Sequence, residues 1–131
     1  MEFNSNKAIY LQIVEHVCEK IMLNVWILEE KIPSVRELAI HLEVNPNTVM
    51  RAYDFLQQKE VIYNKRGIGF FISHEAMKAV KLYKKAIFLE EELPQVLRNI
   101  YLLNISLDEL KDRYQEFVDQ NFNPNQHENE Q

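Results

Sequence analysis

Two helix-start signals lie close together in the chain, and their spacing constrains the fold more than any other feature. Ser34 and Glu37 have the spacing of a capping box, in which the first side chain accepts a bond from the third backbone N–H of the helix. Asn45 is a favourable N-cap, and Pro46 suits the first helical position. The pattern predicts two helices joined by a tight turn, over residues 34–42 and 46–59.

A β-hairpin is predicted directly after the second helix. Residues 61–63 and 69–72 are rich in β-branched and aromatic side chains. Both glycines of the chain lie in this region, where a tight turn needs a positive φ. The hairpin tip, Lys65-Arg66-Gly67, is basic. A helix–turn–helix followed by such a hairpin is typical of a winged-helix DNA-binding domain.

Amphipathic patterns before and after this motif predict four further helices. One covers residues 7–24, where Tyr10 and Ile13 belong to a broad apolar face. The others cover residues 75–89, 94–103 and 106–118. The predicted fold class is mainly α with a small β-hairpin. The predicted domains are a winged helix–turn–helix, a helical dimerisation domain and a disordered tail, over residues 1–73, 74–119 and 120–131.

Composition indicates the compartment of the protein but does not by itself indicate that the protein binds nucleic acid. The chain has 131 residues, of which 47% are hydrophobic, and its net charge is −5. Residues 1–73 carry eight Lys/Arg against nine Asp/Glu, so the DNA-binding hypothesis depends on where individual cations lie. The apolar runs are too short to span a bilayer, and no signal peptide is recognisable. The single cysteine, Cys18, is predicted to be a packed, inert thiol in a cytoplasmic protein.

The sequence does not support an enzyme. The four histidines are scattered without metal-ligand spacing, and the chain has neither a glycine-rich phosphate loop nor a nucleophile elbow. Glu90, Glu91 and Glu92 are most simply a solvated acidic patch or the start of a helix. We therefore predict no catalytic residue, no cofactor and no metal site.

Three groups of residues occur in a characteristic order: Pro33-Ser34-x-Arg36-x-Leu38-Ala39, then Thr48-Val49 with Ala52-Tyr53 and Leu56, then Gly67-x-Gly69. In order and spacing, this region resembles the winged-helix domain of the GntR family of bacterial transcription regulators. The run from Asn45 to Val49, followed by a short helical tail, looks most like the YtrA-type branch, whose small C-terminal helices dimerise. The chain departs from the family at Asn24, Glu29 and Glu60, where relatives commonly have glycine.

The resemblance implies DNA-contacting roles for matching positions. Arg36 corresponds to the family's arginine at the start of the second helix, although a surface ion pair with a neighbouring glutamate is the alternative. The remaining candidates lie on the turn, the recognition helix and the wing: Asn45, Asn47, Thr48, Arg51, Lys65, Arg66 and Gly67. Met50 stands where some relatives carry a DNA-contacting arginine, so the base-reading pattern differs.

The sequence therefore predicts a transcription regulator, with repression favoured, that binds a palindromic double-stranded DNA operator as a homodimer through its C-terminal helices. The resemblance suggests control of a neighbouring transport operon. One alternative is a winged-helix module for protein–protein assembly, which the acidic balance permits. Another is a regulator gated by a small molecule of unknown identity, bound between C-terminal helices near Phe88, Leu97 and Tyr101.

Overall fold

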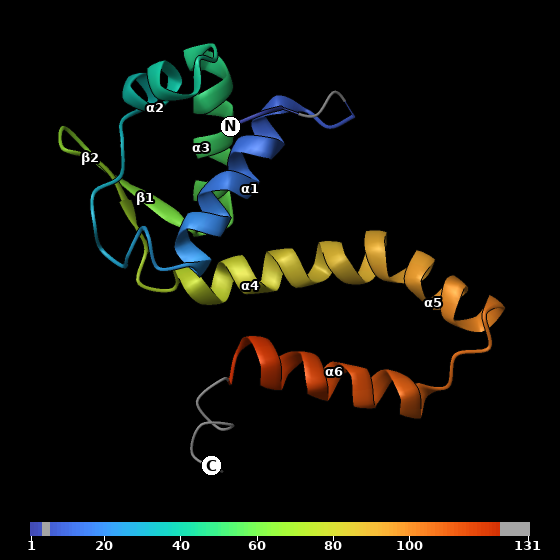
Figure 1. Ribbon diagram of the computed structural model, residues 1–131. Helices are drawn as coiled ribbons and strands as arrows, with labels where there is room; N and C mark the ends of the chain where they lie inside the picture. Colours follow the sequence, from blue (N-terminus) through green and yellow to red (C-terminus); the bar gives the residue numbers. More distant parts are fainter. Residues whose placement is uncertain (4–5, 124–131) are drawn as a thin grey trace. The chain divides into compact units, whose positions relative to one another are not determined.

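The structure is a computed structural model that describes residues 1–3 and 6–123, and the chain falls into two compact units. The first unit spans Met1–Ala86 and contains three helices, a hairpin and most of a fourth helix (Figure 1). The second unit begins at Ile87, and its regular elements are helices where it is described. The predicted fold class, mainly α with one two-stranded hairpin, is confirmed.

Local side-chain bonds start both helices of the central motif where the sequence predicts them. Ser34 Oγ accepts the Glu37 N–H at 3.1 Å, and Asn45 Oδ1 accepts the Asn47 N–H at 2.8 Å. Each cap satisfies a backbone donor that the first turn of a helix leaves unpaired. The three helices of this part are α1 (Ile9–Met22), α2 (Val35–Leu42) and α3 (Pro46–Gln58).

The hairpin pairs β1 (Ile62–Lys65) with β2 (Gly69–Ile72) in antiparallel register. The segment before α2 joins it through a bridge between Lys31 and Phe71. The N–H of Glu29 also donates to the carbonyl of Ile72 at 2.8 Å. The connector between α1 and α2 is therefore bonded to β2 of the hairpin.

The core of the first unit is mostly apolar and contains one fully buried tyrosine. Tyr53 of α3 is fully buried, and its hydroxyl donates to the Pro33 carbonyl at 2.6 Å. Its ring meets the Phe70 ring edge-on, with centroids 4.9 Å apart. Tyr53 thus joins α3 to the start of α2 and to the hairpin. The thiol of Cys18 lies in the same core, and burial raises its pKa to about 11, which fits the predicted inert thiol.

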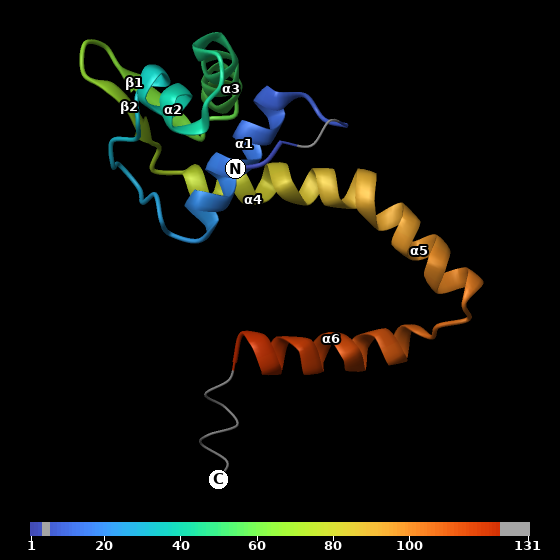
Figure 2. The ribbon, with the colours of Figure 1, turned by 45° about the horizontal axis from the view of Figure 1, so that its top comes forward.

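The first unit extends past residue 73, where the sequence analysis set the domain boundary. Helix α4 (Ala76–Ile87) buries Ala76 and Val80 fully in the core formed by the preceding elements. In both ribbon views, α4 lies at the end of this unit opposite α2 and the hairpin turn (Figures 1 and 2). The first three turns of α4 are therefore part of the winged-helix unit.

Four helices end in a left-handed residue that is not glycine. After α3, the N–H of Glu60 donates to Gln57 and the N–H of Val61 donates to Leu56, which is the bond pattern of a Schellman motif. The same pattern closes α1, α2 and α5 at residues with φ between 55° and 58°, namely Asn24, Glu43 and Asn104. Glu29 also has a positive φ, of 63°. Asn24, Glu29 and Glu60, where the resemblance implies glycine, thus have left-handed backbone conformations.

The second unit has helices, and none of its residues from 87 to 123 is buried. It contains a short π-helical segment followed by α5 (Leu93–Leu102) and α6 (Leu107–Asn121). Ser106 caps α6 by accepting the Glu109 N–H at 3.1 Å, as predicted. Helix α6 continues through Gln120 and Asn121, which the sequence analysis assigned to a loose tail. The side chain of Asn121 donates to the Phe117 carbonyl at 2.9 Å and supports the last turn. Residues 124–131 of that tail lie outside the described residues.

Candidate nucleic-acid interface

The outward side of α3 is the starting point for a nucleic-acid interface. Its other side is anchored by four buried residues, Val49, Ala52, Tyr53 and Leu56. Helical geometry then leaves Asn47 and Arg51 exposed in the first two turns, with Thr48 half-buried beside them. A recognition helix presents this N-terminal part to the edges of bases.

The structure gathers the predicted α3 residues around one shallow hollow of about 390 Å³. The start of α1 forms the opposite wall of the hollow. Its lining residues are Ala8, Ile9, Tyr10, Asn45, Asn47, Thr48 and Arg51. Four predicted site residues are thus brought together, and the start of α1 joins them. Asn45 has a second role here, because its side-chain oxygen already caps α3.

Tyr10 is a residue of this region that the sequence analysis placed only in the core. The guanidinium carbon of Arg51 lies 4.0 Å from the centre of the Tyr10 ring, which is a close cation–π contact. The helical pattern of α1 correctly makes Tyr10 part of an inward face. The pattern does not predict the contact with Arg51, because Arg51 belongs to another helix.

The predicted wing residues lie at and beside the hairpin turn. Arg66 and Gly67 form the exposed turn, and Gly67 has a φ of +80°. Lys65 instead belongs to β1, with its ammonium 4.7 Å from the centre of the Phe71 ring. Sequence reasoning missed Lys31, whose side-chain carbon lies only 3.0 Å from where a Cβ on Gly69 would be. The hairpin therefore carries a third cation along its side.

Arg36 is the second residue of α2, and its side chain is exposed. The sequence left open an ion pair with Glu37 or Glu43. Over residues 1–3 and 6–123, the structure contains no ion pair of Arg36 with either glutamate. The guanidinium remains accessible to a ligand such as a phosphate.

The division into units explains the acidic net charge. Met1–Ala86 carries twelve Lys/Arg against ten Asp/Glu, a net charge of +2. The sequence from Ile87 onward carries three against ten, a net charge of −7. The acidity that weakened the DNA-binding hypothesis therefore resides in the second unit. The four lysines of α4 account for the change in the first.

Comparison with known proteins identifies the family. The family described as "Bacterial regulatory proteins, gntR family" matches residues 9–72. The HTH-type transcriptional regulator YhcF of Bacillus subtilis is 30% identical over 90% of this chain and 96% of its own. This chain belongs to the GntR family. The HTH-type transcriptional repressor YtrA of B. subtilis is 34% identical over 81% of each chain, which supports the YtrA-type branch.

A solved structure supports the same assignment for the GntR chain. A transcriptional regulator of the GntR family from Bacteroides thetaiotaomicron is 47% identical, with a TM-score of 0.73. The match covers 86% of this chain and 98% of that one. The protein is thus a DNA-binding transcription regulator with the winged-helix fold, and its family and relatives are regulators rather than enzymes.

Two further observations concern other kinds of site in the GntR chain. No group of three or more candidate metal ligands occurs among the residues that the structure describes. No helix in this part of the chain is long and apolar enough to cross a membrane.

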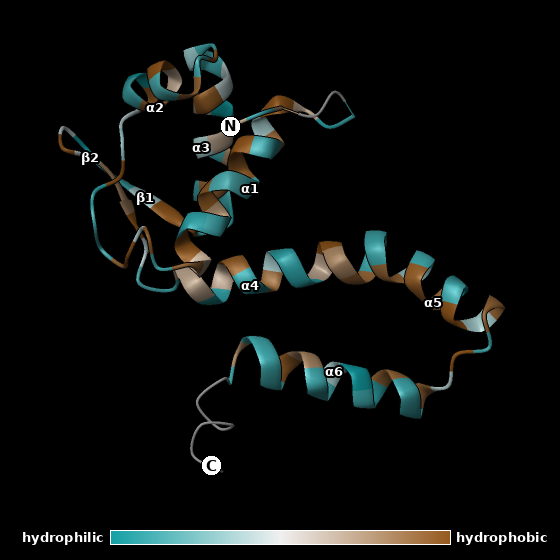
Figure 3. Cartoon of the chain, in the orientation of Figure 1, coloured by the Kyte–Doolittle hydropathy of each residue, from teal (hydrophilic) through white to brown (hydrophobic). Residues whose placement is uncertain are grey.

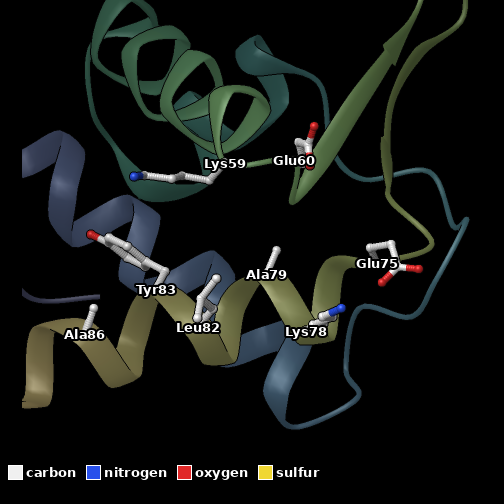
Figure 4. Close-up of a pocket in the computed structure, with 8 residues that line it drawn as sticks. All are labelled: Lys59, Glu60, Glu75, Lys78, Ala79, Leu82, Tyr83 and Ala86. Atoms are coloured by element: carbon white, nitrogen blue, oxygen red, sulfur yellow. The ribbon is translucent and has the colours of Figure 1, made fainter.

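A second hollow of the winged-helix unit lies away from Asn47 and Arg51. It has a volume of about 570 Å³ and lies between the end of α3 and α4. Ala79 and Leu82 point from α4 toward α3, and Lys59 and Tyr83 border one side (Figure 4). By contrast, the residues expected to line a pocket in the C-terminal helices are exposed. The exposed fraction is 44% for Phe88, 50% for Leu97 and 82% for Tyr101.

Proposed function

We propose that this protein is a homodimeric repressor that binds a palindromic operator, with α3 in the major groove and the wing on the flanking backbone. The observation that carries the proposal is the outward side of α3. Asn47 and Arg51 are exposed there, in the first two turns of the recognition helix of the family. In a two-fold dimer, this geometry requires half-sites about 34 Å apart.

The wing supplies cations to the proposed complex. Arg66 at the exposed turn, Lys65 on β1 and Lys31 next to Gly69 suit contacts to phosphate oxygens, which fix the position of a protein on DNA without reading sequence. Arg36 on α2 is an accessible fourth cation. Base reading is assigned to Asn47, Thr48 and Arg51.

The second unit supports the homodimer. None of its helical residues is buried, although apolar residues recur along α5 and α6 (Figure 3). Large apolar side chains that stay exposed in one chain indicate a surface that another protein covers. A second copy is the simplest partner, because a two-fold interface brings the same face from both chains together. The exposed residues include Leu97, Tyr101, Leu103, Leu107, Tyr114, Phe117 and Phe122.

The relatives support the proposals of repression and of a class of regulated genes. YtrA, at 34% identity, is a transcriptional repressor, so we assign repression to this chain as well. The YtrA-type resemblance supports control of an adjacent transport operon, and action on the chromosome sets the protein in the cytoplasm. Deleting the gene should raise transcription of neighbouring genes. Unchanged transcript levels would argue against this role.

DNA binding is tested with fragments from the protein's own promoter region in a fluorescence-anisotropy titration. Arg51→Ala and the double change Lys65→Ala/Arg66→Ala should each weaken binding without unfolding the protein. The wing variant should also reduce the slope of log K against log salt by roughly 0.9 for each phosphate that it no longer neutralises. The matched control is Lys81→Ala/Lys85→Ala, which removes two exposed cations from α4. Wild-type affinity in both test variants would refute the interface.

The homodimer is tested by sedimentation of the full chain. Tyr101→Glu places a charge on the proposed interface at a residue that is 82% exposed in one chain. The variant should sediment as a folded monomer and bind the operator more weakly. Gln115→Glu, on the polar side of α6, introduces the same charge and should remain dimeric. A monomeric wild-type protein would overturn the assignment.

A further inference from the structure

We propose that Tyr10 is a positioning residue for DNA binding, which holds the guanidinium of Arg51 at the reading face. The inference rests on the proposed role of Arg51 in the interface. It begins from the 4.0 Å separation between the Arg51 guanidinium carbon and the centre of the Tyr10 ring. Both residues line the hollow that also contains Asn47 and Thr48.

The position of the Arg51 guanidinium over the ring suits a side chain that must bind DNA. A guanidinium that lies on an aromatic face keeps the N–H donors along its edge available, while the ring restricts its movement. Within the part of the chain that the structure describes, Arg51 has no ion pair with a carboxylate that would hold it instead. Tyr10 therefore orders Arg51 without consuming the donors that a base or phosphate would accept.

Other rings hold Tyr10 in place. The ring of Phe55, one turn after Arg51 on α3, meets Tyr10 edge-on with centroids 6.4 Å apart. Phe55 in turn meets Tyr83 of α4, with centroids 5.4 Å apart. This aromatic row runs through the first unit from Arg51 to α4. A buttressed ring is a firmer support than an isolated surface tyrosine, whose rotamer would be free to change.

Two substitutions of Tyr10 distinguish the positioning role from simple core packing. A core tyrosine contributes apolar area, part of which the smaller leucine retains. A positioning tyrosine contributes the face of its ring, which phenylalanine retains and leucine lacks. Tyr10→Phe and Tyr10→Leu therefore form a matched pair.

The test measures operator affinity in a double-mutant cycle with Arg51→Ala. Tyr10→Leu should weaken binding about 2- to 5-fold for each half-site, the range of an exposed cation–π contact. Two copies on one operator would give a total of about 4- to 25-fold. Tyr10→Phe should bind like the wild type. In the Arg51→Ala background, Tyr10→Leu should have no further effect, because the residue that it positions is gone.

A second measurement is independent of DNA. In the free protein, NMR signals of the Arg51 guanidinium protons should be shifted upfield by the ring of Tyr10. The shift should persist in Tyr10→Phe and disappear in Tyr10→Leu. Unchanged signals in Tyr10→Leu, or an equal loss of affinity with and without Arg51, would overturn the positioning role. If the wild type binds no promoter DNA while the NMR shift is present, the contact between Tyr10 and Arg51 is confirmed and the proposed function is wrong.

Discussion

Replacing Glu60 by glycine should stabilise this protein. Glu60 closes α3 with a φ of 62°, a conformation in which the Cβ of an L-residue crowds its own backbone. Its side chain is exposed, and the bonds of the turn use only backbone atoms of this residue. In one of these bonds, the carbonyl of Glu60 accepts the Ser73 hydroxyl at 2.6 Å. Glycine keeps all of these bonds and removes the crowded Cβ.

The size of the effect follows from two opposing terms. A left-handed conformation costs an L-residue roughly 1–2 kcal/mol. Glycine gives back part of this, roughly 0.5–1 kcal/mol, because it loses more backbone freedom on folding. The net stabilisation is about 0.5–1 kcal/mol, which for a unit of this size raises the melting temperature by about 2–8 °C.

The assay is thermal unfolding of the full chain, followed by circular dichroism at one fixed protein concentration. Glu60→Gln is the control for charge, because it removes the carboxylate but keeps the Cβ, and it should melt like the wild type. Glu19→Gly is the control for glycine itself, because Glu19 lies within α1, where glycine should lower the melting temperature. A melting temperature for Glu60→Gly at or below that of the wild type would refute the reasoning.

Two further predictions concern buried and half-buried polar groups. Tyr53→Phe should lower the free energy of unfolding by about 1–3 kcal/mol in urea titrations, because it leaves the Pro33 carbonyl without its donor; an unchanged midpoint would contradict this. Burial, with a smaller contribution from Lys20, lowers the pKa of His16 below 6.5 in the folded state. The unfolded chain then binds the proton more readily, so stability should fall as the pH drops through 6.5. His16→Gln should reduce this slope, and an identical slope in both proteins would show that other groups cause it.

Much of the fold was predictable because its determinants are local. A cap such as Ser34 or Asn45 bonds to a backbone N–H two or three residues away, so the residues that set the helix start are neighbours in sequence. The hairpin turn depends on Gly67 in the same way. The segments of the proposed DNA-binding region could therefore be outlined from the sequence. The end of α6 was less predictable, because polar residues without an apolar pattern can still extend a helix.

The domain boundary was not predictable from local pattern. Ala76 and Val80 have the spacing of an amphipathic helix, but that spacing does not say which surface the helix packs against. The structure places both in the core of the first unit. As a consequence, the lysines of α4 count with the winged helix, and the charge of this unit becomes positive.

The sequence by itself determined the order of elements and the helix starts, since each depends on near neighbours along the chain. Only the tertiary structure decided which side chains meet across elements. It set Tyr10 of α1 under Arg51 of α3 and Lys31 beside Gly69 of the wing. The physical reason is that such contacts depend on how helices and strands pack, and the periodicity of one element contains no information about its partner.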